Sequence, residues 1–158
     1  MNSETLPKMI VYRITLAKYA GELFASGNPA RWNSKDVKVI YTASSRSLAC
    51  LENVVHRSSL GLKGNFKTIL IEIPDNIEVE EIKISDLSPN WREFTQYPYT
   101  QKLGDEWNKK ASTAVLKVPS AIIPEECNYL INPFHKDFTL IKYLGNEPFD
   151  FDERIKAI

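Results

Sequence analysis

Runs of apolar residues alternate with polar turns along the chain, and their spacing predicts more strands than helices. Segments rich in β-branched and aromatic residues predict strands over 9–15, 37–43, 66–74, 112–124, 127–133 and 138–144, with an edge strand over 77–87. Helices are predicted over about 45–58 and 99–110, and 16–27 forms either a short helix or a loop. Strands and helices do not alternate regularly, which favours a mixed α+β domain over a doubly wound fold.

Turn and breaker residues set the expected ends of these elements. The YPY segment over 97–99 is expected to interrupt a helical piece that opens at 88–91, and Gly104 is expected to weaken the helix over 99–110. No internal repeat, low-complexity block or linker divides the chain. The sequence therefore predicts a single domain over 1–158.

The helix predicted over 45–58 carries a carboxylate within its apolar stripe. The spacing i, i+3, i+4, i+7 of one buried face is followed by Leu48, Leu51, Glu52 and Val55. Burying a carboxylate without a partner is unfavourable. Glu52 is therefore either exposed at the end of the stripe or paired with a nearby group. A structural ion pair and a functional site both account for such a residue.

The charge balance and the composition narrow the classes of function. The 158 residues include 20 Lys and Arg against 20 Asp and Glu, so no net field recruits nucleic acid or an anionic membrane. No apolar run is long enough to predict a membrane span, and the first residues lack the features of a signal peptide. Cys50 and Cys127 form no CxxC pair, so we expect a reduced, cytoplasmic protein.

Several common sites are not predicted. The two histidines, His56 and His135, lie far apart and lack the spacing of metal ligands, so no metal is expected. Neither GxGxxG nor GxxxxGK[ST] occurs, which argues against a dinucleotide-binding loop of the Rossmann type and against a P-loop.

Four side chains outside the helix are candidates, each with a structural alternative. Arg13 is either an outward-facing strand residue or an anion clamp, and Arg31, beside a tryptophan, is either a stacked surface residue or a phosphate ligand. Tyr41, at a strand end, is either buried with a bonded hydroxyl or turned toward a flat heterocycle. Ser120 follows a proline and is most simply a turn residue. Together with Glu52, this set suits a phosphorylated, ring-bearing ligand whose sugar becomes cationic.

The sequence resembles the RES-domain family, bacterial toxins usually encoded beside a Xre-type antitoxin. The resemblance is carried by VYRI around Arg13, ARWN around Arg31, VIYTASS around Tyr41, LACLENVVH around Glu52 and His56, LKVPSAIIP around Ser120, and NYLINPFHKDF followed by FDFDERI. These segments occur in the family's order and cover nearly the whole chain. The resemblance implies a fold like that of ADP-ribosyltransferases, with a split mixed β-sheet, flanking helices and a cleft for NAD.

The resemblance also implies roles for individual residues. Arg31 and Arg13 would hold the NAD phosphates, and Tyr41 would stack on nicotinamide. The family often has glycine before the RW or RF pair, where this chain has Ala30. Because glycine adopts positive φ angles readily, alanine there is expected to shift the loop that carries Arg31.

The remaining roles concern the sugar. Glu52 would stabilise the ribosyl cation, Ser120 would bond the ribose or carboxamide region, and His56, one turn after Glu52, is a further binding candidate. The residues expected to be catalytic are Glu52, Arg31 and Tyr41. A negative charge near the sugar suits an oxocarbenium-like state, and the leaving nicotinamide is neutral, so no strong general acid is needed.

The function implied is an NAD-consuming toxin that arrests growth. NAD would be the substrate rather than a cofactor, and hydrolysis or phosphorolysis would break the nicotinamide–ribose bond. The alternatives are transfer of ADP-ribose to a protein and a non-catalytic binding module with the same fold. The resemblance further implies a Xre-like antitoxin partner and a toxin that is a homodimer within the complex.

Overall fold

A seven-stranded mixed sheet forms the centre of the molecule within residues 8–56 and 64–155, which the computed structural model describes. Its strands are β1 (Lys8–Leu16), β2 (Ile40–Ala43), β3 (Phe66–Pro74), β4 (Val79–Glu81), β5 (Val115–Pro119), β6 (Cys127–Ile131) and β7 (Lys142–Phe149). The helices that flank the sheet are α1 (Arg46–His56) and α2 (Tyr97–Lys110). The expected α+β class with a mixed sheet is confirmed.

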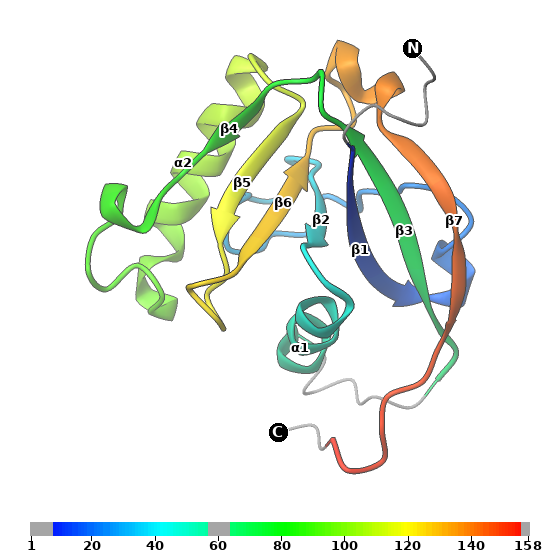
Figure 1. The fold of residues 1–158 in the computed structure, drawn as a ribbon. Helices are drawn as coiled ribbons and strands as arrows, with labels where there is room; N and C mark the ends of the chain where they lie inside the picture. The colour runs from blue at the N-terminus through cyan, green and yellow to red at the C-terminus, as the bar shows by residue number, and fades with distance from the viewer. Residues whose placement is uncertain (1–7, 57–63, 156–158) are drawn as a thin grey trace.

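The sheet is divided near its middle. Its strand order is β4-β5-β6-β2-β1-β3-β7, with β4 and β5 parallel and the other neighbours antiparallel. β1 pairs with β3 along its whole length, whereas β1 and β2 share one residue pair, Tyr12 with Ala43. Figure 1 shows the two halves diverging below this contact, with α1 beneath the gap.

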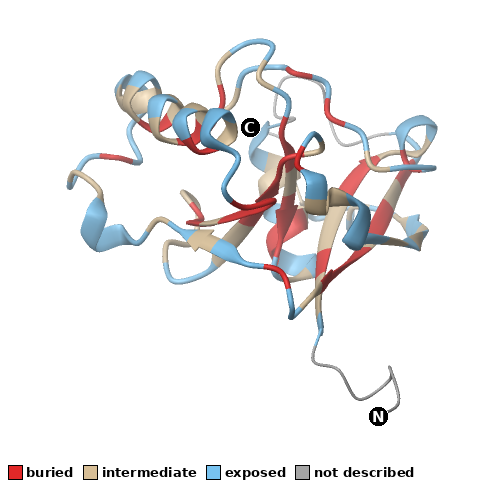
Figure 2. Ribbon diagram, turned by 90° about the horizontal axis from the view of Figure 1, so that it is seen from above, coloured by how far each residue is buried: buried red, intermediate tan, exposed pale blue. Residues whose placement is uncertain are grey.

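Apolar residues bury both faces of the central strands. On β5, Val115 packs in the cluster that also holds Ile40 of β2, whereas Leu116 packs with Trp107 of α2 on the opposite face. α1 packs Leu48 against Phe66 in a separate cluster beside the gap. Figure 2 shows the buried residues concentrated on the strands and on the inner side of α2. Burial of this kind fixes both helices against the sheet.

Most of the predicted strands are confirmed. The strands expected over 9–15 and 127–133 appear as β1 and β6, and the strand over 66–74 appears as β3 with the predicted bounds. The strands expected over 37–43 and 112–124 appear in shorter form, and β5 ends at Pro119.

The edge strand expected over 77–87 is confirmed only in part. β4 lies at the edge of the sheet, but it spans three residues and is followed by the 3₁₀ helix Ile84–Asp86.

The strand predicted over 138–144 is wrong over 138–141 and confirmed over 142–144, where β7 begins. Residues Lys136–Leu140 form a 3₁₀ helix, and β7 begins only at Lys142. His135 starts this helix, because its Nδ1 accepts a hydrogen bond of 2.9 Å from the backbone N–H of Asp137. Such a local bond between side chain and backbone competes with extended pairing.

The predicted interruption at 97–99 is also wrong, because this segment begins α2. Pro98 lies in the first turn of the helix, where a backbone N–H is not needed. The 3₁₀ helix Phe94–Gln96 leads directly into it. Of the alternatives for 16–27, the structure has a 3₁₀ helix over Ala17–Tyr19 followed by irregular chain.

The predicted helix over 45–58 is α1, and positions 57–58 lie outside the described residues. Ser45 caps this helix, since its Oγ accepts a hydrogen bond of 3.1 Å from the N–H of Leu48. Within residues 8–56 and 64–155, no helix is long and apolar enough to cross a bilayer.

Candidate active site

A cavity of about 560 Å³ opens where the two halves of the sheet diverge. Five of the predicted site residues line it: Arg13, Arg31, Tyr41, Glu52 and His56. They come from β1, the loop after it, β2 and α1. A volume of this size is typical of small-molecule sites, which lie in the range of about 300–1,000 Å³. The sixth predicted residue, Ser120, is fully buried beside the cavity and reaches Glu52.

Glu52 lies on the side of α1 that faces the cavity. The prediction of one buried stripe is wrong at two of its positions, because Leu51 is 40% exposed and Val55 is 51% exposed. The buried residues of α1 are instead Leu48 and Ala49, which pack against the strands. Val55 and Glu52 both line the cavity instead of packing against the strands.

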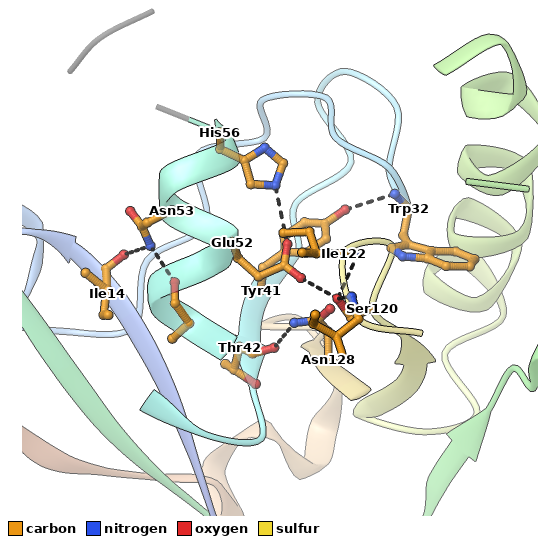
Figure 3. A network of polar contacts seen from close by, with 12 residues as sticks. Ile14, Trp32, Tyr41, Thr42, Glu52, Asn53, His56, Ser120, Ile122 and Asn128 are labelled. Atoms are coloured by element: carbon orange, nitrogen blue, oxygen red, sulfur yellow. Dashed lines mark hydrogen bonds and ion pairs between the residues drawn. The ribbon is translucent and has the colours of Figure 1, made fainter. Parts of the chain in front are cut away.

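The carboxylate of Glu52 is paired, which decides between the two alternatives raised for it. The Ser120 hydroxyl donates a hydrogen bond of 2.9 Å to Oε1, and the Nε2 atom of His56 lies 3.7 Å from Oε2 (Figure 3). Burial raises the pKa of Glu52, while Ser120, His56 and the charge of Arg31 oppose that rise. Desolvation in the cavity therefore disfavours the charged form of Glu52, and its three partners offset part of that penalty.

Ser120 acts both as a turn residue and as a partner of Glu52. Its Oγ accepts hydrogen bonds of 3.1 Å from the N–H groups of Ile122 and Ile123, and it donates to Glu52 (Figure 3). Two backbone donors thus orient the hydroxyl so that its proton points at the carboxylate. This arrangement fixes one oxygen of Glu52 relative to β5.

The loop that carries Arg31 is held by α2. Thr100 Oγ1 donates a hydrogen bond of 2.6 Å to the carbonyl of Arg31, and Gln101 Nε2 donates one of 2.9 Å to the carbonyl of Ala30. The carboxylate of Asp105 accepts bonds of 3.0 and 2.6 Å from the N–H and hydroxyl of Ser34. The backbone of the 30–34 loop is therefore fixed along one side of the helix.

Close approach of the helix to the loop requires glycine at 104. A Cβ at this position would lie 1.7 Å from the carbonyl oxygen of Trp32. Gly104 was expected only to weaken the helix, but it lets the two backbones touch.

The guanidinium of Arg31 lies at the cavity wall. Its Nη1 donates a hydrogen bond of 3.2 Å to the carbonyl of Trp91. Arg31 also acts on Glu52 electrostatically, lowering the pKa of that carboxyl. The cationic and anionic groups expected at the two ends of the ligand thus share one cavity.

The backbone at Ala30 does not need a glycine, and a shift of the Arg31 loop relative to glycine-bearing members of the family stays a prediction. Positive φ angles at non-glycine residues occur, in the described part of the chain, at Asp36 and Ala111. Ala30 forms an isolated antiparallel bridge with Asn33, with an N···O distance of 3.0 Å. An alanine therefore suits the backbone conformation at 30 without strain.

Tyr41 has the bonded hydroxyl of the first alternative proposed for it, and stacking on a flat heterocycle stays a prediction. Its hydroxyl donates to the Oδ1 of Asn33 and accepts a hydrogen bond of 3.2 Å from the N–H of Trp32, while the residue lines the cavity. Burial raises the pKa of Tyr41 far above its ordinary value, so the phenol stays protonated. Its backbone carbonyl accepts a hydrogen bond of 2.9 Å from Nη1 of Arg13 across the gap.

The cavity residues that escaped the sequence analysis include Tyr97, Asn128 and Asn53. Asn128 Nδ2 donates a hydrogen bond of 3.2 Å to the carbonyl of Thr42, and the Asn128 side chain also lowers the pKa of Glu52. Asn53 Nδ2 donates one of 2.9 Å to the carbonyl of Ile14 and so ties α1 to β1 (Figure 3). Asn53 directly follows Glu52 in the predicted helix, and that adjacency is the signal that was available.

Comparison with known proteins agrees with this geometry. The family model described as RES domain matches residues 10–152. The chain therefore belongs to the RES domain family.

Individual relatives and a solved structure refine that assignment. A protein of Sphingobium sp. named "Prs ADP-ribosylating toxin" is 40% identical over 127 residues, covering 79% of each chain. "Toxin Res" of Yersinia enterocolitica is 36% identical over 153 residues, covering 94% of this chain and 100% of the relative. The toxin–antitoxin complex MbcT–MbcA of M. tuberculosis contains a chain of the same fold, with a TM-score of 0.74 and 15% identity, covering 92% of this chain and 86% of that one.

Proposed function

We propose that this protein is an NAD-consuming toxin that breaks the nicotinamide–ribose bond in the cavity between the halves of its sheet. The observation that carries the proposal is that Glu52 and Arg31, which come from different elements, line the same cavity. Its relatives are named toxins, and one of them is named an ADP-ribosylating toxin. Growth arrest would then follow from loss of NAD.

The residues divide the work between the two ends of the dinucleotide. Arg31, with Arg13, binds the diphosphate, for which the forked geometry of arginine is suited. Tyr41 presents its ring to nicotinamide. Glu52 lies near the ribose and stabilises the positive charge that develops as the C1′–N1 bond breaks.

The reaction balances without a strong acid. The electron pair of the C1′–N1 bond leaves with the nicotinamide, which becomes a neutral ring. An oxygen of the acceptor forms the new bond to C1′, and a water or protein acceptor loses its proton to the solvent or a nearby base. Ser120 holds Glu52 in place throughout, and His56 lies within 3.7 Å of the same carboxylate.

The test is the exchange Glu52→Gln, which removes the charge and keeps the shape. We expect the variant to fold and to lose release of nicotinamide from NAD, measured by chromatography. Glu78→Gln, at an exposed position in the loop before β4, is the matched control and should keep full activity. Equal turnover by Glu52→Gln and the parent protein would refute the catalytic role, and no nicotinamide from the parent protein would favour a non-catalytic binding module.

A second candidate for the acceptor is a protein, so that ADP-ribose is transferred rather than released. The specific support is the name of the relative that is 40% identical, an ADP-ribosylating toxin. NAD turnover with and without phosphate separates hydrolysis from phosphorolysis. Mass spectrometry of proteins incubated with NAD and the toxin would reveal transfer as an added ADP-ribosyl group.

The proposal includes an antitoxin that closes the cavity. It is supported by the fold shared with a chain of a toxin–antitoxin complex. A Xre-like class of antitoxin and a homodimeric toxin stay predictions. Co-expression with the neighbouring gene product, followed by measurement of complex mass by light scattering, tests both.

A further inference from the structure

Aromatic rings and a carbonyl hold the guanidinium of Arg31. Its Cζ atom lies 4.8 Å from the centre of the Tyr97 ring and 5.9 Å from that of Trp91, and the carbonyl of Trp91 accepts its hydrogen bond. Within residues 8–56 and 64–155, no carboxylate lies within 4.0 Å of the guanidinium nitrogens. In the described part of the chain, the arginine is therefore held by ring faces and a carbonyl, not by a carboxylate in direct contact.

Contacts with ring faces and a carbonyl suit a guanidinium that binds an anionic ligand. A carboxylate would hold Arg31 as firmly but would compete with a phosphate for the same N–H groups. The face of an aromatic ring attracts the guanidinium through its quadrupole and leaves its positive charge intact. The less side-chain freedom Arg31 loses on binding, the tighter the complex.

Tyr97 is itself well placed to stay fixed. It is the first residue of α2, and its ring packs against Phe94 with centroids 5.0 Å apart. Phe94 belongs to the 3₁₀ helix that leads into α2. α2 also holds the backbone of Arg31, through the hydrogen bond from Thr100. The backbone carbonyl and the guanidinium of Arg31 thus both contact residues of α2.

We propose that Tyr97 is a positioning residue that orders Arg31 through its ring face and aims the guanidinium at a phosphate of the bound dinucleotide. The identity of the ligand rests on the proposed function. The ordering of Arg31, in contrast, is a property of the ligand-free protein and can be measured without any substrate.

The ring can be separated from the hydroxyl by substitution. Tyr97→Phe keeps the face and should behave as the parent protein, whereas Tyr97→Leu and Tyr97→Met remove it. The matched control is Tyr19→Leu. Tyr19 also carries a cation on its ring, with Lys18 Nζ 5.0 Å from the centroid, and stacks on Phe24, but it does not line the cavity.

Two measurements test the proposal. The first is ¹⁵N relaxation of the Arg31 Nε–H group, whose order parameter should fall in Tyr97→Leu and stay at the parent value in Tyr97→Phe. The second is calorimetry with ADP-ribose, which should bind about 3- to 30-fold more weakly to Tyr97→Leu. In NAD turnover the KM should rise by a similar factor with little change in kcat, because the lost contact acts on ground state and transition state alike.

The outcomes are distinct. Unchanged Arg31 order and unchanged affinity in Tyr97→Leu would overturn the proposal, and so would equal losses in Tyr97→Phe and Tyr97→Leu, since the hydroxyl would then be responsible. If Tyr97→Leu does not fold, Tyr97→Met supplies the same comparison. A parent protein that neither binds ADP-ribose nor consumes NAD would refute the proposed function, while the relaxation data would still decide the role of Tyr97.

Discussion

Gly104 is the point where α2 touches the backbone of the Arg31 loop. Its replacement by alanine has two opposing effects on stability, a gain in helix propensity and a clash with the loop. Helix propensity alone favours Gly104→Ala by about 1 kcal/mol, because alanine loses less backbone entropy. The structure predicts the opposite. The new Cβ would lie 1.7 Å from the carbonyl oxygen of Trp32 and 2.7 Å from its carbonyl carbon.

The size of the clash decides whether Gly104→Ala raises or lowers the free energy of unfolding. Carbon and oxygen atoms in contact lie about 3.3–3.6 Å apart, so helix and loop must separate by roughly 1.6 Å. Overpacking of this kind costs about 1–3 kcal/mol. The hydrogen bonds from Thr100 and Gln101 to the loop would also stretch, each worth about 0.5–1.5 kcal/mol. After the gain in propensity, we expect a net loss of about 1–5 kcal/mol.

The loss should appear in both stability and activity. For a domain of this size, about 1–5 kcal/mol lowers Tm by roughly 2–20 °C in a thermal scan. A shift of about 1 Å in a positioning group can cost on the order of 100-fold in rate, and Arg31 lies on the displaced loop.

A control on the same substitution is available. Gly21→Ala places its Cβ where no atom lies within 4 Å, so it should change Tm little. A Gly104→Ala protein as stable and as active as the parent would refute the close approach of α2 to the loop.

Further predictions concern the charged groups of the cavity. Ser120→Ala should lower kcat/KM by about 10- to 150-fold, since it removes a hydrogen bond to a charged group worth about 1.5–3 kcal/mol; unchanged kinetics would mean that Glu52 is held by other contacts. Arg31→Lys should weaken NAD binding in calorimetry while leaving Tm nearly unchanged, because the fork is lost and the charge kept; equal affinity would count against phosphate binding at this position. Burial raises the pKa of Glu52, so the native state binds its proton more tightly than the unfolded chain. The stability from this group is complete below the unfolded pKa of about 4.3 and is lost as pH rises through the higher native pKa. Urea unfolding should therefore show Glu52→Gln to be more stable than the parent at pH 7, with the difference shrinking toward about pH 4, and NAD turnover should fall as Glu52 takes up its proton. A parent protein equally stable relative to Glu52→Gln at both pH values would contradict this pKa direction.

The sequence predicted well those features that depend on neighbouring residues. β1 and β3 follow from short-range patterns of β-branched residues, and the helix of Glu52 follows from its periodicity. The same periodicity predicted burial of Leu51 and Val55, and that prediction is wrong because both residues are exposed. A helical pattern reports which residues share a face, but it does not report that the surface opposite them is missing.

Contacts between distant segments could not be predicted from the sequence. Ser120 and Glu52 are 68 positions apart, and the contact of Gly104 with Trp32 joins a helix to a loop that precedes it by 72 positions. A serine after proline and a glycine in a helix each have a sufficient local explanation. The resemblance to a family was the only signal that placed Ser120 near the sugar. In the structure the Ser120 hydroxyl bonds to Glu52, and its contact with the ligand stays a prediction.

The division of the sheet explains why two arginines contribute differently to one cavity. Where β1 and β2 diverge after the Tyr12–Ala43 pair, the carbonyl of Tyr41 has no strand N–H from β1 opposite it. Nη1 of Arg13 supplies that donor at 2.9 Å, so a side chain replaces a bond of the ladder while the strands stay apart. Arg31 belongs to a loop and is oriented by α2 and by aromatic rings. Arg13 therefore joins the two halves of the sheet at the cavity as well as lining it, whereas Arg31 reaches the cavity from a loop.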